Sequence, residues 1–158
     1  MRIKMKIKLF FLFIMFYSTL AIAQREYARL DNDRGTSMEP ILARAEPLIE
    51  EIEEEGFEIV RMEYDIISTE KVTYRTLYKD WEYGIVAFGD YRIKDIDVAV
   101  YEKVRGKWKL FEKDAENDDE AMVTIKPYKD GEHKIEISVF KYNKDYSVGH
   151  YGLLILHE

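Results

Sequence analysis

The sequence contains no cysteine, and it has only 3 prolines and 8 glycines in 158 residues. The absence of cysteine excludes disulfides, thiolate metal ligands and the lipid-modified cysteine that anchors a bacterial lipoprotein. The chain also lacks the glycine-rich phosphate-binding motifs of nucleotide-binding proteins, the HExxH motif of zinc peptidases and the GxSxG motif of serine hydrolases. The protein must therefore be stabilised by its apolar core, and no familiar catalytic motif is present.

Positive charge is also scarce. The chain has 24 Lys and Arg against 31 Asp and Glu, which gives a net charge of −7. Four of the basic residues lie within MRIKMKIK at the very start, so the rest of the chain carries a net charge of −11. Since affinity for nucleic acid depends on basic side chains that neutralise phosphates, this balance argues against a nucleic-acid partner.

The N-terminal segment is typical of a secretory signal peptide. Its basic start is followed by the apolar run LFFLFIMFYSTLAIA, which ends in Ala21-Ile22-Ala23, the small-x-small pattern that signal peptidase cleaves. The apolar core of this run is too short for a comfortable membrane span of about 20 residues. We therefore expect a signal peptide over residues 1–23 and an exported protein, periplasmic or secreted, that is not a lipoprotein. After cleavage we expect no membrane span.

The rest of the chain begins with a polar leader and one helix. Residues 24–36 are polar and predict a flexible leader. Residues 37–56 carry apolar side chains at helical spacing, with Ser37 expected at the N-cap and Gly56 at the C-terminal end. Pro47 lies inside this pattern and predicts a kink or a break. The apolar face of the helix needs a partner, so we expect it to pack on the domain that follows.

From residue 57 to residue 158 the hydrophobic period changes to two. Short segments alternate apolar and polar side chains, and turn-forming residues such as Arg105-Gly106 separate them. No helical pattern lies between the segments, which disfavours a parallel sheet. We therefore predict a mainly β fold, an antiparallel, jelly-roll-like β-sandwich of about eight strands with the amphipathic helix before it. In the segment 81–88 the residues expected to face the core are Trp81, Tyr83, Ile85 and Ala87.

The predicted strands carry their motifs in a recognisable order. These motifs are D-x-D at 95–97, an Asp-rich loop at 114–119, a strand that ends at Pro127, a hairpin at 131–135 and a closing strand with Tyr151-Gly152. This order resembles the bacterial pre-peptidase C-terminal domain family over residues 72–156. The resemblance implies a secreted β-sandwich that serves exported enzymes as a non-catalytic accessory or binding module. It also implies a partner outside the cytoplasm, and related modules bind calcium or extracellular polymers.

Acidic side chains gather around the D-x-D strand. Two of them project from one face of that strand, about 6.5–7 Å apart, and others lie in the loop before it and in a later loop. Calcium prefers six to eight oxygen ligands from flexible loops, and this composition meets that requirement. Alternatively, the aspartates accept hydrogen bonds from loop amides and nearby basic side chains and hold the loops in place. The candidate metal ligands are Asp90, Asp95, Asp97, Asp114 and Asp118.

Aromatic residues are the other candidates for binding. Sheets favour aromatic pairs across strands, and this structural role accounts for most of the 12 tyrosines and 2 tryptophans. Tyr142 and Tyr146 lie in the polar loop YNKDYSVGHY, where side chains at the end of a sandwich are exposed, and are predicted to contact a ligand or partner. The sequence thus favours an exported non-catalytic module that binds a protein or polymer, with calcium as a candidate cofactor. The alternatives are a carbohydrate-binding module, an exported hydrolase and a peptidase-associated inhibitor.

Overall fold

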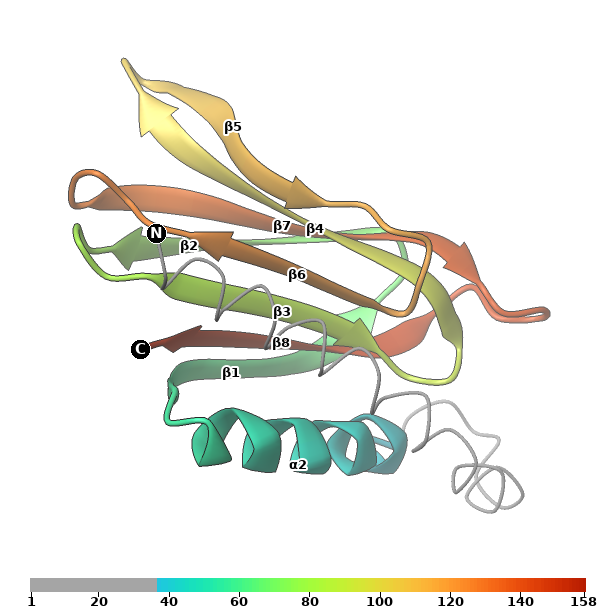
Figure 1. The fold of residues 1–158 in the computed structure, drawn as a ribbon. Helices are drawn as coiled ribbons and strands as arrows, with labels where there is room; N and C mark the ends of the chain where they lie inside the picture. The colour runs from blue at the N-terminus through green and yellow to red at the C-terminus, as the bar shows by residue number, and fades with distance from the viewer. Residues whose placement is uncertain (1–36) are drawn as a thin grey trace. The chain divides into compact units, whose positions relative to one another are not determined.

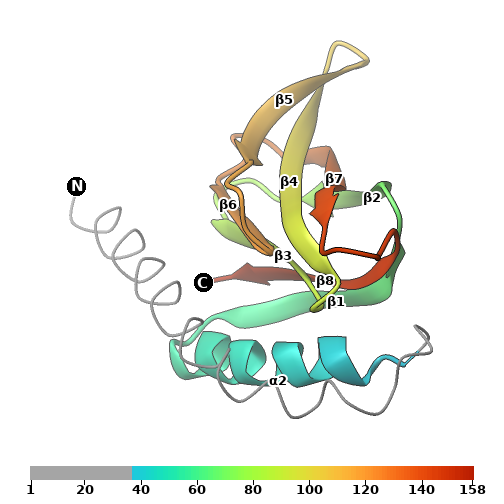
Figure 2. The same ribbon diagram turned by 90° about the vertical axis from the view of Figure 1, so that its right-hand side faces the viewer.

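The fold is seen in a computed structural model, which describes residues 37–158. The predicted signal peptide (1–23) and leader (24–36) lie outside the described residues. Two antiparallel sheets of four strands pack face to face, and one helix covers the outer surface of one sheet (Figures 1 and 2). The predicted antiparallel β-sandwich of eight strands with a helix before it is confirmed.

Each sheet draws its strands from both halves of the domain. Sheet A has the order β1 (Glu58–Ile67), β8 (Gly149–His157), β3 (Tyr83–Gly89) and β6 (Glu120–Ile125). Sheet B has the order β2 (Glu70–Leu77), β7 (Gly131–Tyr142), β4 (Ile93–Val104) and β5 (Lys107–Asp114). Strands β4 and β5 form a hairpin whose turn residues, Arg105 and Gly106, both have positive φ, as the predicted turn requires.

Helix α2 (Glu39–Glu54) precedes the sheets and lies along sheet A (Figures 1 and 2). Its N-cap is Met38, so the prediction of Ser37 was wrong by one residue. The helix continues through Pro47 without a break and ends at Glu54. As predicted, Gly56 follows this C-terminal end, and its φ of 86° suits a residue without a Cβ. Within residues 37–158 no helix is long and apolar enough to cross a membrane.

Two apolar layers hold the domain together. The larger layer lies between the sheets and includes Ile85, Ile96, Val98, Ile135 and Leu153. The smaller layer lies between α2 and sheet A, and it consists of Ile41, Ala45, Leu48 and Ile52 of the helix with Val86, Phe88, Leu154 and Leu156 of the sheet. Strands β3 and β8 are therefore buried on both faces, which explains why their sequences read as continuous apolar runs.

Four residues of the segment 81–88 were predicted to face the core, and the prediction is correct for three of them. Tyr83, Ile85 and Ala87 belong to the layer between the sheets. Trp81 does not, because β3 begins only at Tyr83 and the alternation does not reach back to residue 81. The Trp81 side chain is 46% exposed, and its ring lies 4.2 Å from the ring of His157.

Candidate functional site

Asp90 is buried in the loop between β3 and β4. Its Oδ1 accepts a hydrogen bond from the Arg92 amide at 3.0 Å, and its Oδ2 accepts one from the Arg92 Nε at 2.9 Å. The amide of His150 also donates to Oδ2, at 3.2 Å, and a second guanidinium nitrogen of Arg92 bonds both Asp90 and the His150 ring. Both carboxylate oxygens of Asp90 are therefore engaged within the protein, where they join the loop to β8.

Asp95 and Asp97 flank the core residue Ile96 on β4, and both are 7% exposed. Asp97 Oδ2 lies 3.0 Å from Nζ of Lys113 on β5. Asp95 pairs with Lys141 in the β4–β7 register. Burial, followed by repulsion from Asp97, raises the pKa of the Asp95 carboxyl. Lysines from both neighbouring strands thus offset part of this negative charge.

Asp114 and Asp118 accept hydrogen bonds from main-chain amides of β6, the strand that follows their loop. Asp114 Oδ2 accepts from the Met122 amide at 2.8 Å, and Asp118 Oδ1 accepts from the Glu120 amide at 3.3 Å. The loop does approach the D-x-D strand, but through its backbone, because the Asp118 carbonyl accepts from the Ile96 amide at 2.9 Å. These carboxylates therefore shape the loop rather than point at a shared centre.

The five predicted metal ligands take part in separate contacts. Within residues 37–158 no group of three or more His, Cys, Asp or Glu side chains is placed to hold a metal ion. The contacts match the alternative interpretation, in which the aspartates hold loops through amides and basic side chains. The arrangement does not fit a ready-made calcium site, and calcium binding stays a prediction that unfolding experiments can test.

The two predicted contact tyrosines have different surroundings. The Tyr142 ring packs against the core, and its hydroxyl donates to the Ile67 carbonyl at 2.8 Å. Burial raises the pKa of Tyr142 to about 12. Tyr146 lies edge-to-face with Tyr91, with 5.7 Å between the ring centres, and Tyr91 is 36% exposed. Tyr142 thus makes structural contacts, and a ligand role for either tyrosine stays a prediction.

Exposed apolar and aromatic side chains gather on the outer face of sheet B. Val72 and Tyr74 of β2 are 40% and 49% exposed, Leu110 of β5 is 50% exposed, and Phe140 of β7 is 81% exposed. The ring of Tyr74 lies 5.6 Å from that of Trp108 on β5, although β7 and β4 run between these two edge strands. The two rings therefore reach toward each other across the sheet.

Charged side chains lie among these rings. Lys103 Nζ is 5.2 Å from the centre of the Trp108 ring and 3.0 Å from Glu132 Oε2. Lys134 Nζ is 3.8 Å from the centre of the Tyr101 ring and 2.7 Å from Glu136 Oε2. Ion pairs near the surface contribute only about 0–1 kcal/mol each, so these groups can exchange partners with a ligand at little cost. We call this surface the ring face: Tyr74, Tyr101, Trp108 and Phe140 with Lys103, Lys134, Glu132 and Glu136.

No protein-family model and no curated protein matches the sequence. Among solved structures, the pre-peptidase C-terminal domain of Bacillus anthracis collagenase is similar, with a TM-score of 0.42, 13% identity and coverage of 60% of this chain and 87% of that domain. A surface-associated copper-binding protein of Methylomicrobium album BG8 has a TM-score of 0.50 and 7% identity over 60% of this chain and 91% of its own. A periplasmic inhibitor of g-type lysozyme from Aeromonas hydrophila has a TM-score of 0.40 and 10% identity, with 66% and 90% covered.

These likenesses concern the fold alone. The pre-peptidase C-terminal domain, which the sequence resembles in the order of its motifs, is also among the folds that the structure resembles. At such low identity the neighbours assign no ligand to this chain. Any functional inference must therefore come from its own side chains.

Proposed function

We propose that this protein is an exported, non-catalytic β-sandwich module that binds a polysaccharide on the ring face of sheet B. The observation that carries the proposal is the set of rings and charged side chains gathered on that face. Helix α2 covers the outer face of sheet A, and no described element lies over the ring face in Figures 1 and 2. Export is supported by the signal-peptide pattern of the first 23 residues.

A polysaccharide suits the composition of the ring face better than a protein partner does. Sugar rings present C–H faces that pack on aromatic side chains, and hydroxyl groups that hydrogen-bond to charged ones. The ring face offers both, because Tyr74 and Trp108 adjoin the Lys103–Glu132 pair. The centres of protein–protein interfaces are instead depleted in Lys, Glu and Asp.

The ring face is also a surface for binding rather than for catalysis. Its ionisable groups are paired with one another on an open sheet, whereas an acid–base catalyst needs a differentiated pair of groups in a cleft. Its side chains stand on the paired strands of a packed sandwich, which hold them in a fixed order for a long polymer. A non-catalytic role is therefore the better fit to this surface.

Affinity electrophoresis in gels that contain soluble neutral or anionic polysaccharides tests the proposal. We expect at least one polysaccharide to retard the wild-type protein, and Tyr74→Ala/Trp108→Ala to weaken that binding at least about tenfold, because stacked rings contribute about 0.5–1.5 kcal/mol each beyond burial. The control is Trp81→Ala, which removes an exposed tryptophan that lies against His157 of sheet A. No retardation by any polysaccharide, or equal retardation of the double variant, would contradict the proposal.

A further inference from the structure

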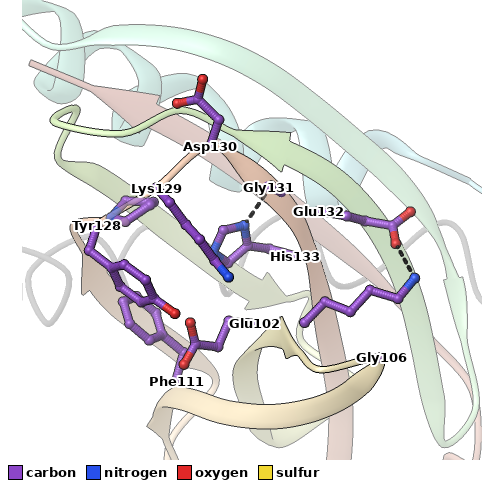
Figure 3. A pocket seen from close by; sticks show the side chains of 11 residues that line it. Glu102, Gly106, Phe111, Tyr128, Lys129, Asp130, Gly131, Glu132 and His133 are labelled. Carbon is purple, nitrogen blue, oxygen red and sulfur yellow. Dashed lines mark hydrogen bonds and ion pairs between the residues drawn. The ribbon is translucent and has the colours of Figure 1, made fainter.

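A pocket of about 340 Å³ lies where the β4–β5 hairpin meets the turn between β6 and β7, next to the ring face, with which it shares Lys103 and Glu132. Glu102 and Phe111 line it from the hairpin, and Tyr128, Lys129 and His133 line it from the turn and the start of β7. Figure 3 shows the Glu102 carboxylate, the His133 ring and the Lys129 ammonium turned toward the same space. The volume is that of a small-molecule site.

Glu102 is the unusual group in this pocket. It is only 9% exposed and lies directly opposite His133 in the β4–β7 register. Among the described residues its carboxylate has no hydrogen-bond donor and no ion-pair partner. The carboxylate borders the open space of the pocket, so it can accept hydrogen bonds from a bound donor.

His133 supplies a second acceptor beside Glu102. The His133 side chain is 4% exposed, and its Nδ1 lies 3.0 Å from the Gly131 carbonyl oxygen. A carbonyl only accepts, so Nδ1 carries the hydrogen and Nε2 keeps its lone pair. Burial lowers the pKa of His133, which keeps the imidazole neutral at neutral pH. The pocket therefore presents two acceptors side by side.

The pocket also has an aromatic wall. The Phe111 ring lies edge-on to His133, with 6.0 Å between the ring centres. The Lys129 ammonium lies 5.4 Å from the centre of the Tyr128 ring, which is a cation–π distance. Lys129 and Tyr128 are both exposed, so the lysine side chain can turn into solvent and leave the ring to another cation.

We propose that this pocket binds the primary ammonium group of a small organic ligand. The ammonium donates hydrogen bonds to the Glu102 carboxylate and to Nε2 of His133, and the apolar part of the ligand packs against Phe111 and Tyr128. A charged donor matched to a buried carboxylate and an aromatic wall is the combination that holds organic cations in proteins. This proposal does not depend on polysaccharide binding, because it uses none of the rings of the ring face.

Benzylamine is a suitable probe, and benzyl alcohol is its neutral counterpart of the same shape. In ¹H–¹⁵N correlation spectra of the protein at neutral pH, benzylamine is expected to shift the amides of Phe111, Gly131 and His133 in a saturable manner. Benzyl alcohol is expected to bind at least about tenfold more weakly, because it lacks the charge that pairs with Glu102. The comparison of the two ligands on the wild-type protein needs no variant.

Glu102→Gln then tests the role of the carboxylate directly. The exchange keeps the size of the side chain and breaks no hydrogen bond or ion pair among the described residues, so the fold is expected to be retained. Benzylamine binding is expected to weaken at least about tenfold in this variant. Equal binding of the amine and the alcohol, unchanged binding in Glu102→Gln, shifts confined to other surfaces, or no saturable shift at tens of millimolar amine would each overturn the proposal.

Discussion

The guanidinium of Arg44 is a polar link between α2 and sheet A, and its removal tests how the helix is held. The Arg44 side chain is 8% exposed. Its Nη1 donates to the Gly89 carbonyl at 2.6 Å and to Asp119 Oδ2 at 2.5 Å, and its Nη2 donates to Glu120 Oε2 at 3.2 Å. One side chain thus joins the helix to the end of β3 and to the start of β6.

We expect Arg44→Met to lower the free energy of unfolding by about 2–3 kcal/mol. Methionine keeps most of the apolar stem but removes the charge. Removing one partner of a fully buried ion pair costs about 3–5 kcal/mol. The value here lies below that range, because the Asp119 side chain is 42% exposed and regains water. For a domain of this size the melting temperature would fall by about 6–15 °C.

Urea unfolding followed by circular dichroism measures this loss. The control is Arg61→Met, because the Arg61 side chain is 44% exposed and pairs with Glu63 at the surface. That control is expected to change stability by no more than about 0.5 kcal/mol. A double-mutant cycle of Arg44→Met with Asp119→Asn is expected to give a coupling energy of at least about 1 kcal/mol. Additive effects, or a loss equal to that of Arg61→Met, would refute the reasoning.

Two further predictions concern β8 and the acidic loops. A Cβ at Gly152 would stand 2.2 Å from Phe88 Cζ, so Gly152→Ala should lower the free energy of unfolding in urea by about 1–3 kcal/mol. The control is Gly131→Ala, which should change stability little because nothing lies within 4 Å of a Cβ at that position. Equal unfolding midpoints for the two variants would contradict this prediction. Thermal unfolding in excess EDTA and then in millimolar calcium tests the calcium prediction. A site filled at about 100 times its Kd adds about 2.7 kcal/mol, and Asp95→Asn/Asp97→Asn should abolish the shift. Identical wild-type curves would reject a calcium site.

The positions of the strands were predictable because the period of two is a local property of the chain. Alternation alone does not say which side of an edge strand is buried. Val72 and Tyr74 of β2 look like core residues in the sequence, yet they lie on the exposed face of sheet B, and the other side of this strand carries Thr73 and Arg75. An edge strand covers only the margin of the core, so polar side chains are tolerated on its inner side.

The contacts of the site residues depend on register, which the sequence does not reveal. Lys113 reaches Asp97 only because β5 pairs with β4 across a bulge between Val100 and Tyr101. In the same way, Glu102 and His133 are far apart in the chain and meet only through the β4–β7 pairing. The sequence alone showed that aspartates are concentrated around the D-x-D strand. The residues that contact these aspartates became known only from the pairing of the strands.

Because α2 covers sheet A, the helix limits where this protein can be truncated. A shortened chain that starts at β1 would expose to water the side chains of Val86, Phe88, Leu154 and Leu156, which the helix now hides. An exposed apolar patch on the central strands of a sheet promotes association between molecules. Fusions, transplants and expression trials of this sandwich should therefore carry the helix with it, because the self-sufficient unit begins before its first strand.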